Sequence, residues 1–336
     1  MTTASDSTEL VISPADLNRT TQILGSVSHV FDQRLVGQPG LRTVLVTALI
    51  GGGHVLLESV PGLAKTLSAQ TLAEAVGGSF KRIQCTPDLM PNDIIGTQIY
   101  NFGNGEFTTK LGPVHANLVL LDEINRSSAK TQSAMLEAMQ ERQTSIAGQV
   151  YPLPKPFMVV ATQNPIEEEG TYVLPEAQMD RFLVKEVLGY PAPAQEVEIL
   201  ERVTAGTLTA PLSGEAVSTK DLLFVQKLVE QVYVSTAIKQ YIVGVINTTR
   251  GGGPAPVSDI RTNVRVGASP RGALALMRVA QALALQDGRT YVEPDDVKAL
   301  RHAVLRHRVI RNYDAIASGV PVERLIDAAF AAVPAP

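Results

Sequence analysis

One short stretch decides the fold of this 336-residue chain: Glu58-Ser59-Val60-Pro61-Gly62-Leu63-Ala64-Lys65-Thr66. The residues before it, His54 to Glu58, predict a short buried strand, and the residues from Thr66 onward predict a helix. A strand, a tight loop and a helix form the setting of a phosphate-binding loop, in which backbone N–H groups and the positive end of the helix dipole hold phosphates. In such a loop we expect the Lys65 ammonium on the β- and γ-phosphates of a nucleotide and the Thr66 hydroxyl on Mg²⁺.

The loop differs from the pattern G-x-x-x-x-G-K-[ST] at two positions. Ser59 and Ala64 stand where the pattern has glycine. The loop alone is therefore an imperfect match, and the interpretation depends on what the rest of the chain contains.

The composition is that of a globular protein with large cores. Hydrophobic residues make up 45% of the chain and charged residues 18%, which excludes intrinsic disorder. A chain of 336 residues exceeds one ordinary core, so we expect two domains. The formal net charge of −4 argues against broad electrostatic binding to nucleic acid. No apolar run approaches the roughly 20 residues that span a membrane, so no membrane insertion is expected.

The N-terminus and the cysteine content favour a cytoplasmic protein. Residues 1–10 are polar and lack the basic and apolar layout of a signal peptide. The chain has one cysteine, Cys85, which cannot form an internal disulfide. We expect Cys85 to be a small buried hydrophobe rather than a redox centre.

Short apolar runs alternate with helical stretches from Val36 to about Leu188. The strand candidates are Val55–Glu58, Phe80–Gln84, Leu118–Asp122, Phe157–Thr162 and Phe182–Val187. Continuous apolar strands between helices predict a parallel sheet that is covered by helices on both faces. We therefore place a flexible N-terminus at residues 1–12 and an α/β nucleotide-binding domain at residues 13–190.

The alternation ends at Gly189-Tyr190-Pro191-Ala192-Pro193. Apolar spacing beyond this point predicts helices only, among them one that begins at Ser269-Pro270 and another that begins at Glu293-Pro294. We place an all-α domain at residues 191–336.

Two β-hairpins are predicted inside the first domain. The stretch from Gln98 to Thr108 alternates around Asn104-Gly105, which is a strong hairpin signal, and Thr144 to Leu153 turns near Ala147-Gly148. These hairpins either pack on the surface or serve as working parts, since loops on a rigid scaffold often carry function. The sequence favours the two interpretations equally.

Polar side chains follow two of the predicted strands. Asp122 and Glu123 end the strand Leu118–Asp122, where Asp122 suits Mg²⁺ and Glu123 suits the orientation or deprotonation of an attacking water. Asn164 follows the next strand, at the edge where ligands bind in open α/β sheets, and its amide can reach a γ-phosphate or the water. Alternatively, Asp122 and Glu123 are only solvated acids at the end of a strand. The phosphate-binding loop upstream favours the functional interpretation.

Taken in order, these motifs resemble the MoxR family of AAA+ ATPases. The resemblance runs from about Val36 to Arg271 and rests on five segments: Lys65-Thr66, Asp122-Glu123-Ile124-Asn125-Arg126, Ala161-Thr162-Gln163-Asn164-Pro165, Glu169-Gly170-Thr171-Tyr172 with Leu174 to Phe182, and Gly267-Ala268-Ser269-Pro270-Arg271. It implies an AAA+ parallel sheet flanked by helices, with β-hairpin insertions, followed by an all-α lid.

The resemblance also implies a role for each site residue. Lys65 and Thr66 match the Walker A positions, Asp122 and Glu123 the Walker B pair, and Asn164 matches sensor 1. Arg181 matches the arginine finger that reaches the ATP of a neighbouring subunit, and Arg271, at the start of a lid helix, matches sensor 2. Alternatively, Arg181 only pairs with Asp180 at the surface and Arg271 is simply solvated. The expected nucleotide-binding residues are Val36, Gly37, Ser59, Val60, Pro61, Gly62, Leu63, Ala64, Lys65 and Thr66, with Thr66 and Asp122 on the metal.

Within the phosphate loop, Ser59 departs from the family pattern. The family usually has glycine at this position, whereas it commonly has alanine at the position of Ala64. Serine needs a permitted φ or must strain the backbone, although its hydroxyl can reach a neighbouring backbone group. We therefore expect nucleotide binding, with the rate of hydrolysis left open.

The resemblance implies Mg²⁺-dependent hydrolysis of ATP to ADP and phosphate in a ring, which we expect to be a hexamer as in AAA+ relatives. The ring would act as a chaperone-like remodeller that matures a protein complex or inserts its metal or cofactor, with a separate von Willebrand factor A-domain protein as partner. A nucleotide-dependent switch with little turnover is the alternative. A magnesium-chelatase-like motor and a DNA-acting motor are further alternatives, the latter disfavoured by the acidic chain and its 5% aromatic content.

Overall fold

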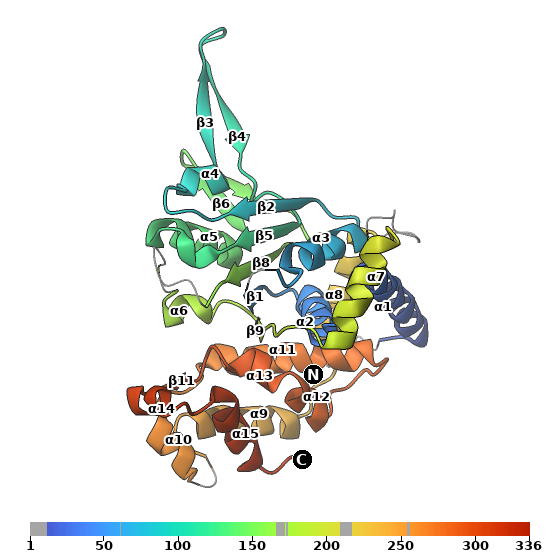
Figure 1. Cartoon of the computed structure of the whole chain (residues 1–336), viewed down its shortest axis with the longest axis vertical. Coiled ribbons are helices and arrows are strands. Elements are labelled where there is room, and N and C mark those ends of the chain that lie inside the picture. The colour runs from blue at the N-terminus through green and yellow to red at the C-terminus, as the bar shows by residue number, and fades with distance from the viewer. Residues whose placement is uncertain (1–11, 61, 166–171, 173, 209–216, 254–255) are drawn as a thin grey trace, which may run out of the picture.

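The computed structural model describes residues 12–60, 62–165, 172, 174–208, 217–253 and 256–336. The expected flexible N-terminus, apart from Ile12, lies outside this range. Figure 1 shows three tiers along the long axis of the molecule: a protruding hairpin, a sheet with its helices, and a helical region at the opposite end.

A five-stranded parallel sheet forms the centre. Its strands are β1 (Val55–Glu58), β2 (Phe80–Gln84), β5 (Leu118–Asp122), β8 (Met158–Gln163) and β9 (Val184–Val187), in the order β2-β5-β8-β1-β9. All four neighbouring pairs are parallel, which confirms the predicted sheet. The carboxyl ends of these strands therefore meet at one edge.

Alternate residues of the strands enter two different cores. In β5, Leu118 and Leu120 belong to one apolar cluster, whereas Val119 and Leu121 belong to the other. The first cluster contains the apolar sides of α1 (Pro14–Arg34), α2 (Pro39–Ile50) and α3 (Lys65–Ala75), and the second that of α5 (Ala129–Glu141). Both faces of the sheet are thus covered, which explains the continuous apolar run of the central strand β5 from Leu118 to Leu121.

The helical region follows β9. Its helices are α7 (Pro193–Thr204), α8 (Thr219–Gln231), α9 (Thr236–Thr249), α10 (Ser258–Asn263), α11 (Pro270–Gln286), α12 (Pro294–Ala299), α13 (Arg301–Leu305), α14 (Tyr313–Ala317) and α15 (Val322–Ala331). The region also contains a two-stranded antiparallel ribbon of β10 (Val264–Val266) and β11 (Ile310–Arg311) that the sequence analysis missed. Strands of two and three residues are too short for an alternating pattern to reveal.

The predicted helix starts at Ser269-Pro270 and Glu293-Pro294 are confirmed by α11 and α12. Ser269 caps α11 by accepting a hydrogen bond from the Arg271 N–H, and Ser13 caps α1 by accepting one from the Asp16 N–H. Side-chain oxygens at this position satisfy backbone donors that have no partner within the helix.

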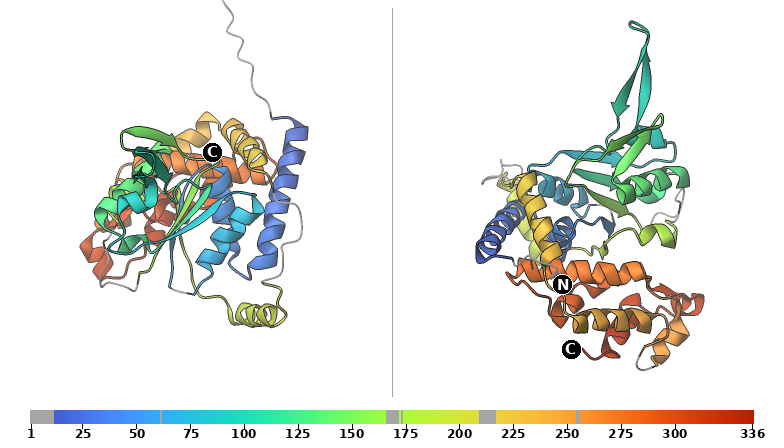
Figure 2. Two further views of the ribbon diagram at one scale, coloured as in Figure 1. Left: turned by 90° about the horizontal axis from the view of Figure 1, so that it is seen from above. Right: turned by 180° about the vertical axis from the view of Figure 1, so that it is seen from behind.

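One apolar cluster joins the sheet to the helical region. Leu45 and Leu49 of α2 belong to the same cluster as Val225 of α8 and Leu276 and Val279 of α11. In contrast, α7 has no buried residue and stands apart from the body of the molecule (Figure 2, left).

Both predicted hairpins are confirmed. Strands β3 (Gly96–Asn101) and β4 (Glu106–Leu111) pair from Gly96 opposite Leu111 to Asn101 opposite Glu106, and β6 (Gln143–Ile146) pairs with β7 (Gln149–Pro152). The β3–β4 hairpin projects far beyond the sheet (Figure 1). Its tip exposes Phe102 and Phe107, both of which contact the Tyr100 ring, with centroid distances of 5.0 and 5.1 Å. The short helices α4 (Pro91–Ile95), η1 (Ile124–Arg126) and α6 (Glu176–Met179) complete the described elements.

Candidate active site

The predicted phosphate loop joins the carboxyl end of β1 to the first residue of α3. Gly62 and Ala64 both have positive φ, 88° and 54°, and no atom lies within 4 Å of the place where a Gly62 side chain would begin. The loop is therefore open to solvent at Gly62. The Lys65 ammonium donates to the Ser59 carbonyl oxygen at 3.3 Å, which holds the side chain back over the loop. Pro61 lies outside the described residues.

Ser59 fits the loop without backbone strain. Its φ is not positive, its side chain is buried, and its hydroxyl donates to the neighbouring Val60 carbonyl oxygen at 3.0 Å. Its N–H donates to the Gln163 carbonyl oxygen, so it continues the pairing of β1 with β8. Ser59 therefore takes the permitted conformation, and the positive φ values in the described part of the loop belong to Gly62 and Ala64.

Asp122 lies at the carboxyl end of β5 and is buried. Its Oδ1 accepts a hydrogen bond from the Thr162 hydroxyl at 2.8 Å, and its Oδ2 pairs with Arg82 of β2, with Nη2 at 2.6 Å and Nε at 3.1 Å. The carboxylate is thus oriented by a neighbour on each side. Thr162 and Arg82 were both missed by the sequence analysis, because their contact with Asp122 depends on the strand order.

Glu123 also contacts β2. It has φ 58°, its N–H donates to the Thr162 hydroxyl at 2.9 Å, and its Oε2 accepts from the Gln84 amide at 2.9 Å. Arg126 lies 3.3 Å from the same oxygen. The register that pairs Gln84 with Asp122 explains these contacts, since it brings the end of β2 next to both acids.

Asn164 is buried just beyond β8 at the same edge of the sheet. The Asn125 amide approaches its carbonyl oxygen at 3.5 Å, which links the segment after β8 to the segment after β5. The edge therefore gathers the phosphate loop, Asp122, Glu123 and Asn164.

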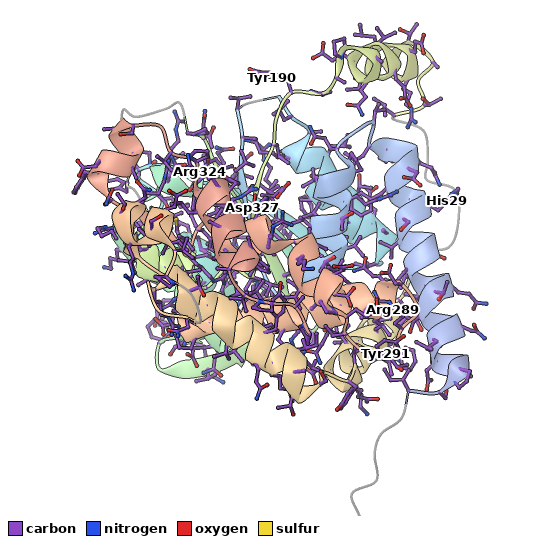
Figure 3. The ribbon with its side chains drawn as sticks, turned by 90° about the horizontal axis from the view of Figure 1, so that it is seen from below. His29, Tyr190, Arg289, Tyr291, Arg324 and Asp327 are labelled. Atoms are coloured by element: carbon purple, nitrogen blue, oxygen red, sulfur yellow. The ribbon has the colours of Figure 1, made fainter. Side chains whose placement is uncertain are left out.

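An apolar pocket of about 370 Å³ lies beside the phosphate loop. It is lined by Val36, Gln38, Gly62, Leu63, Ala64, Tyr190, Pro191, Glu196, Ile199 and Leu200. Gly37 lies next to this pocket and has φ 70°, and a methyl group there would meet the Gln195 side chain of α7 at 2.8 Å. Tyr190 lies on the segment that leads to α7 (Figure 3). The size and apolar lining suit a planar base, in agreement with the expectation for Val36 and Gly37.

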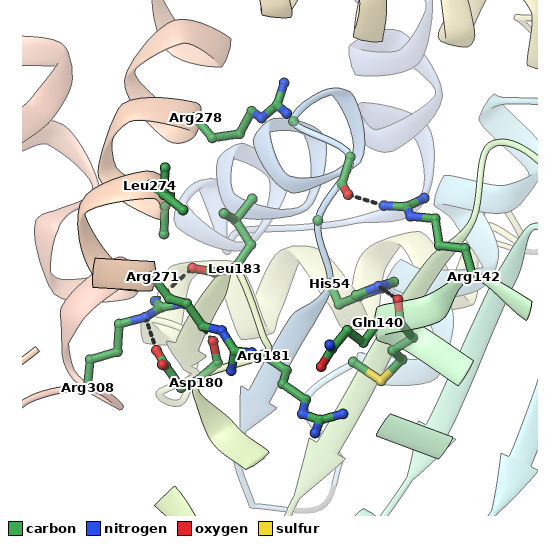
Figure 4. A pocket seen from close by; sticks show the side chains of 15 residues that line it. His54, Gln140, Arg142, Asp180, Arg181, Leu183, Arg271, Leu274, Arg278 and Arg308 are labelled. Atoms are coloured by element: carbon green, nitrogen blue, oxygen red, sulfur yellow. Dashed lines mark hydrogen bonds and ion pairs between the residues drawn. The ribbon is translucent and has the colours of Figure 1, made fainter. Parts of the chain in front are cut away.

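The two predicted arginines lie at the other edge of the sheet. Arg181 lies three residues before β9, whose first residue pairs with Val55 at the start of β1, whereas the phosphate loop follows the end of β1. Arg181 and Arg271 both line a second pocket of about 330 Å³ together with Gly51 to His54, which precede β1 (Figure 4). We call this the arginine pocket, since its lining also includes Arg142, Arg278 and Arg308.

Arg181 does not pair with Asp180, as the surface alternative supposed. Its Nη1 donates to the Leu136 carbonyl oxygen of α5 at 2.9 Å, and within the described ranges its buried Nε has no hydrogen-bond partner. Asp180 instead pairs with Arg308. Burial lowers the pKa of Arg308, and Asp180 counters part of that effect while Arg271 adds to it. Arg271 itself is exposed at the start of α11.

The residues present fit Mg²⁺ bound with a nucleotide. Within the described ranges, no group of three or more His, Cys, Asp or Glu side chains is arranged to hold a metal on its own. Mg²⁺ in phosphate-loop proteins needs only one or two protein oxygens, because phosphates and water complete its shell. The Thr66 hydroxyl and the Asp122 carboxylate supply oxygens of this kind, with Arg82 as the competitor for Asp122.

Other sequence predictions concern features outside the site. Cys85 is buried in the second cluster, and burial raises the pKa of its thiol to about 12. No helix in the described part of the chain is both long and apolar enough to cross a membrane. Most of the Glu169-Gly170-Thr171-Tyr172 segment lies outside the described residues.

Comparisons with known proteins agree with this geometry. The model of the ATPase family associated with various cellular activities matches residues 54–184, and the AAA lid domain model matches residues 258–328. The chain is 50% identical to chaperone MoxR1 of Mycobacterium tuberculosis over 293 residues, covering 87% of this chain and 77% of the relative. It is 42% identical to YeaC of Bacillus subtilis, covering 94% and 95%, and 31% identical to MoxR of Methylorubrum extorquens, covering 90% and 92%.

A solved structure has the same fold. The crystal structure of a protein from Cytophaga hutchinsonii, provisionally described as an ATPase, superposes with a TM-score of 0.86 at 42% sequence identity and covers 96% of each chain.

Proposed function

Because the chain belongs to the MoxR family of AAA+ ATPases, we propose that it hydrolyses ATP with Mg²⁺ at sites shared between copies of itself. One observation carries this proposal. The phosphate loop and both acids lie at the carboxyl edge of the sheet, whereas Arg181 and Arg271 lie at the amino edge. One strand of four residues spans roughly 13 Å, so these arginines are separated from the phosphate loop of their own chain by the sheet.

The arginines therefore serve the nucleotide of a neighbouring copy. The sequence analysis gave this role to Arg181 alone, and the location of Arg271 in the same pocket extends it to both. The buried Nε of Arg181, which has no hydrogen-bond partner among the residues that the structure describes, is consistent with a group that gains its acceptor on assembly. Sites of this kind require each subunit to meet the next head to tail, which closes into a ring, and we propose a hexamer.

In this mechanism each residue does a separate task. The loop from Ser59 to Thr66 and the Lys65 ammonium bind the phosphates, while the apolar pocket beside Val36 and Leu63 binds the base. Thr66 and Asp122 would hold Mg²⁺, which would supply positive charge against the phosphates. Glu123 and Asn164 orient the attacking water, and Glu123 accepts its proton as the γ-phosphoryl group leaves.

The arginines act on the charge that develops during transfer. Arg181 and Arg271 of the neighbouring copy stabilise the γ-phosphoryl oxygens, which adds positive charge without a covalent step. An arginine supplied from a neighbouring chain raises kcat by a factor of about 10³–10⁵ in enzymes that use one.

We further propose that residues 13–190 form the nucleotide-binding domain and residues 191–336 the lid. Hydrolysis changes the packing of α11 against the sheet, and the two hairpins transmit the change to a client. The proposed client is a protein complex that is matured or supplied with metal or cofactor, with a separate von Willebrand factor A-domain protein as partner. The exposed aromatic residues at the tip of β3–β4 support contact with a client.

A switch that turns over slowly is the second candidate. The pairing of Asp122 with Arg82 favours it, because the carboxylate proposed for Mg²⁺ is already occupied by a cation in this conformation.

ATP turnover by the purified chain tests both candidates. We expect steady-state turnover that Lys65→Ala, Glu123→Gln and Arg181→Ala each abolish, and that returns when Lys65→Ala and Arg181→Ala subunits are mixed. Recovery follows because the intact loop of one variant then faces the intact arginines of the other. Absence of turnover in the unmodified chain would support the switch instead, and turnover that Glu123→Gln leaves unchanged would contradict the role proposed for Glu123.

A further inference from the structure

Arg308 lies three residues after the end of α13 and lines the arginine pocket, and its side chain is only 2% exposed. Its Nε donates to Asp180 Oδ1 at 2.8 Å, and its Nη2 donates to the carbonyl oxygens of Phe182 at 2.6 Å and Asp180 at 3.3 Å. Its Nη1 donates to the carbonyl oxygens of Leu183 at 3.1 Å and of Val304. All five N–H groups of the guanidinium are thus used. One side chain of the helical region holds the segment that carries Arg181.

Ser269 links the same segment to Arg271. Its hydroxyl donates to Asp180 Oδ2 at 2.7 Å and accepts from the Arg271 N–H at 3.1 Å. The Asp180 carboxylate therefore contacts Arg308 through one oxygen and the N-terminus of α11 through the other. Arg181 follows Asp180 in the sequence, and Arg271 lies two residues after Ser269, so these hydrogen bonds join the two segments that carry Arg181 and Arg271.

Close packing fixes α11 against this network. A methyl group at Gly272 would lie 3.3 Å from Cδ of Arg308 and 3.2 Å from Cβ of Ala268, so the first turn of α11 leaves no free space there. The two segments that carry Arg181 and Arg271 consequently share one support.

We propose that Asp180, Ser269 and Arg308 are positioning residues that fix the separation of Arg181 and Arg271, so that both guanidinium groups reach the triphosphate of a neighbouring copy together. Two like charges repel, and separate supports would let them diverge. Donors held in place before the reaction need no rearrangement during it, and a displacement of about 1 Å costs about 10²-fold in rate. This inference rests on the proposed function.

A purely structural role is the alternative, in which Asp180 and Arg308 only join the helical region to the sheet. The two roles differ in what they change. Loss of a structural contact lowers the melting temperature, whereas loss of positioning lowers kcat while ATP binding to the same subunit's phosphate loop is kept.

Ser269→Ala in the full-length chain tests the proposal, with Ser235→Ala as the matched control. Ser235 caps α9 in the same way, by accepting from the Ile238 N–H, but does not contact Asp180. We expect Ser269→Ala to lower kcat at least tenfold with the Kd for ATP changed less than twofold, and Ser269→Thr to restore most of the loss. Equal effects of Ser269→Ala and Ser235→Ala on kcat would overturn the proposal.

A second measurement uses Arg271→Ala as the background. If Ser269 acts through Arg271, the double variant Arg271→Ala/Ser269→Ala has a kcat less than twofold below that of Arg271→Ala alone. A full, multiplicative loss in that background would show an independent role and overturn the proposal. Arg308→Lys keeps the charge beside Asp180 but not the contacts to the carbonyl oxygens, and we expect it to behave like Ser269→Ala.

Mixed assemblies separate this inference from the proposed function. Ser269→Ala mixed with Lys65→Ala is expected to recover activity, as is Arg181→Ala mixed with Lys65→Ala. If neither mixture recovers, the shared site itself is wrong and both proposals fall. If only the Arg181→Ala mixture recovers, the shared site stands and the positioning role of Ser269 is rejected.

Discussion

Ala64 takes a left-handed backbone conformation at the point where the phosphate loop enters α3. Alanine in this conformation costs about 1–2 kcal/mol, and glycine avoids the cost, although its unfolded state is more flexible by about 0.5–1 kcal/mol. We expect Ala64→Gly to leave the free energy of unfolding unchanged or to raise it by up to about 1 kcal/mol. Urea unfolding would measure this change.

Ala134→Gly, in the middle of α5, is the matched control, since the same substitution in a right-handed helix costs about 1 kcal/mol. If Ala64→Gly were as destabilising as the control, the left-handed conformation of Ala64 would be contradicted.

Arg82 competes with Mg²⁺ for Asp122. The Arg82 side chain is 49% exposed, so its ion pair is worth at most about 1 kcal/mol, which corresponds to about fivefold in an equilibrium constant. We expect Arg82→Gln to lower the Mg²⁺ concentration for half-maximal ATP turnover by about two- to fivefold. The adjacent exposed residue supplies the control Lys81→Gln, which should leave the value unchanged. A higher Mg²⁺ requirement in Arg82→Gln would mean that Arg82 supports the metal site.

At the scale of elements, the β3–β4 hairpin depends on the close packing of Gly112 against the backbone of Ile94 and Gly96 at its base. A methyl group at Gly112 would lie 2.1 Å from the Ile94 carbonyl oxygen and 2.6 Å from the Gly96 nitrogen. Because both are backbone atoms, Gly112→Ala must displace the start of the hairpin, and overpacking of this kind costs about 1–3 kcal/mol.

Hydrogen exchange of the β3 and β4 amides would measure this effect. We expect protection of these amides to fall in Gly112→Ala while the central sheet keeps its protection. Gly103→Ala, at the tip, is the control, because the nearest atom there is a side-chain oxygen of Asn101 at 3.2 Å that can move. Unchanged protection in Gly112→Ala would contradict the close approach.

The elements that could be predicted from the sequence are those with local signals. The strands of the sheet are short apolar runs, the hairpins carry Asn104-Gly105 and Ala147-Gly148 turns, and the helix starts carry Ser or Pro. The contacts of Arg82 with Asp122 and of Arg308 with Asp180 could not be predicted, because they depend on strand order and on how the helical region packs. The position of Arg271 beside Arg181 depends on the same long-range packing.

At the scale of the whole molecule, buried histidines make stability depend on pH. His54 is buried between Met139 and Val159, and burial, followed by the charge of Arg142, lowers its pKa to about 4. Burial, followed by Arg308, also lowers the pKa of His307 well below its usual value. Both side chains are thus neutral in the fold and become protonated in the unfolded chain below about pH 6.5.

Unfolding then takes up protons, so the free energy of unfolding falls as the pH drops below about 6.5 and continues to fall until the folded pKa is reached. Between pH 7.5 and 5.0, His54 alone accounts for a loss of about 2 kcal/mol. Chemical denaturation across this range would measure the loss, and His54→Gln should make the dependence shallower by that amount. A stability that is level or rises as the pH falls to 5.0 would contradict the neutral buried state.

The continuous core limits how the proposed lid can move. Leu45 and Leu49 of α2 share one cluster with Val225, Leu276 and Val279 of the helical region. A rigid-body opening would expose this apolar surface at about 25 cal/mol per Å². Motion of α11 during hydrolysis is therefore expected as sliding of packed helices rather than as free hinge rotation.

The buried cysteine makes the chain well suited to site-specific spectroscopy. Cys85 is the single cysteine of the chain, and its thiol is shielded in the core with a pKa of about 12, so maleimide reagents react with it slowly in the native state. Phe102→Cys at the hairpin tip and Leu274→Cys on α11 would each place one reactive thiol at an exposed position. Dyes attached to both would report the distance between hairpin and lid through energy transfer while ATP turns over, without first removing the native cysteine.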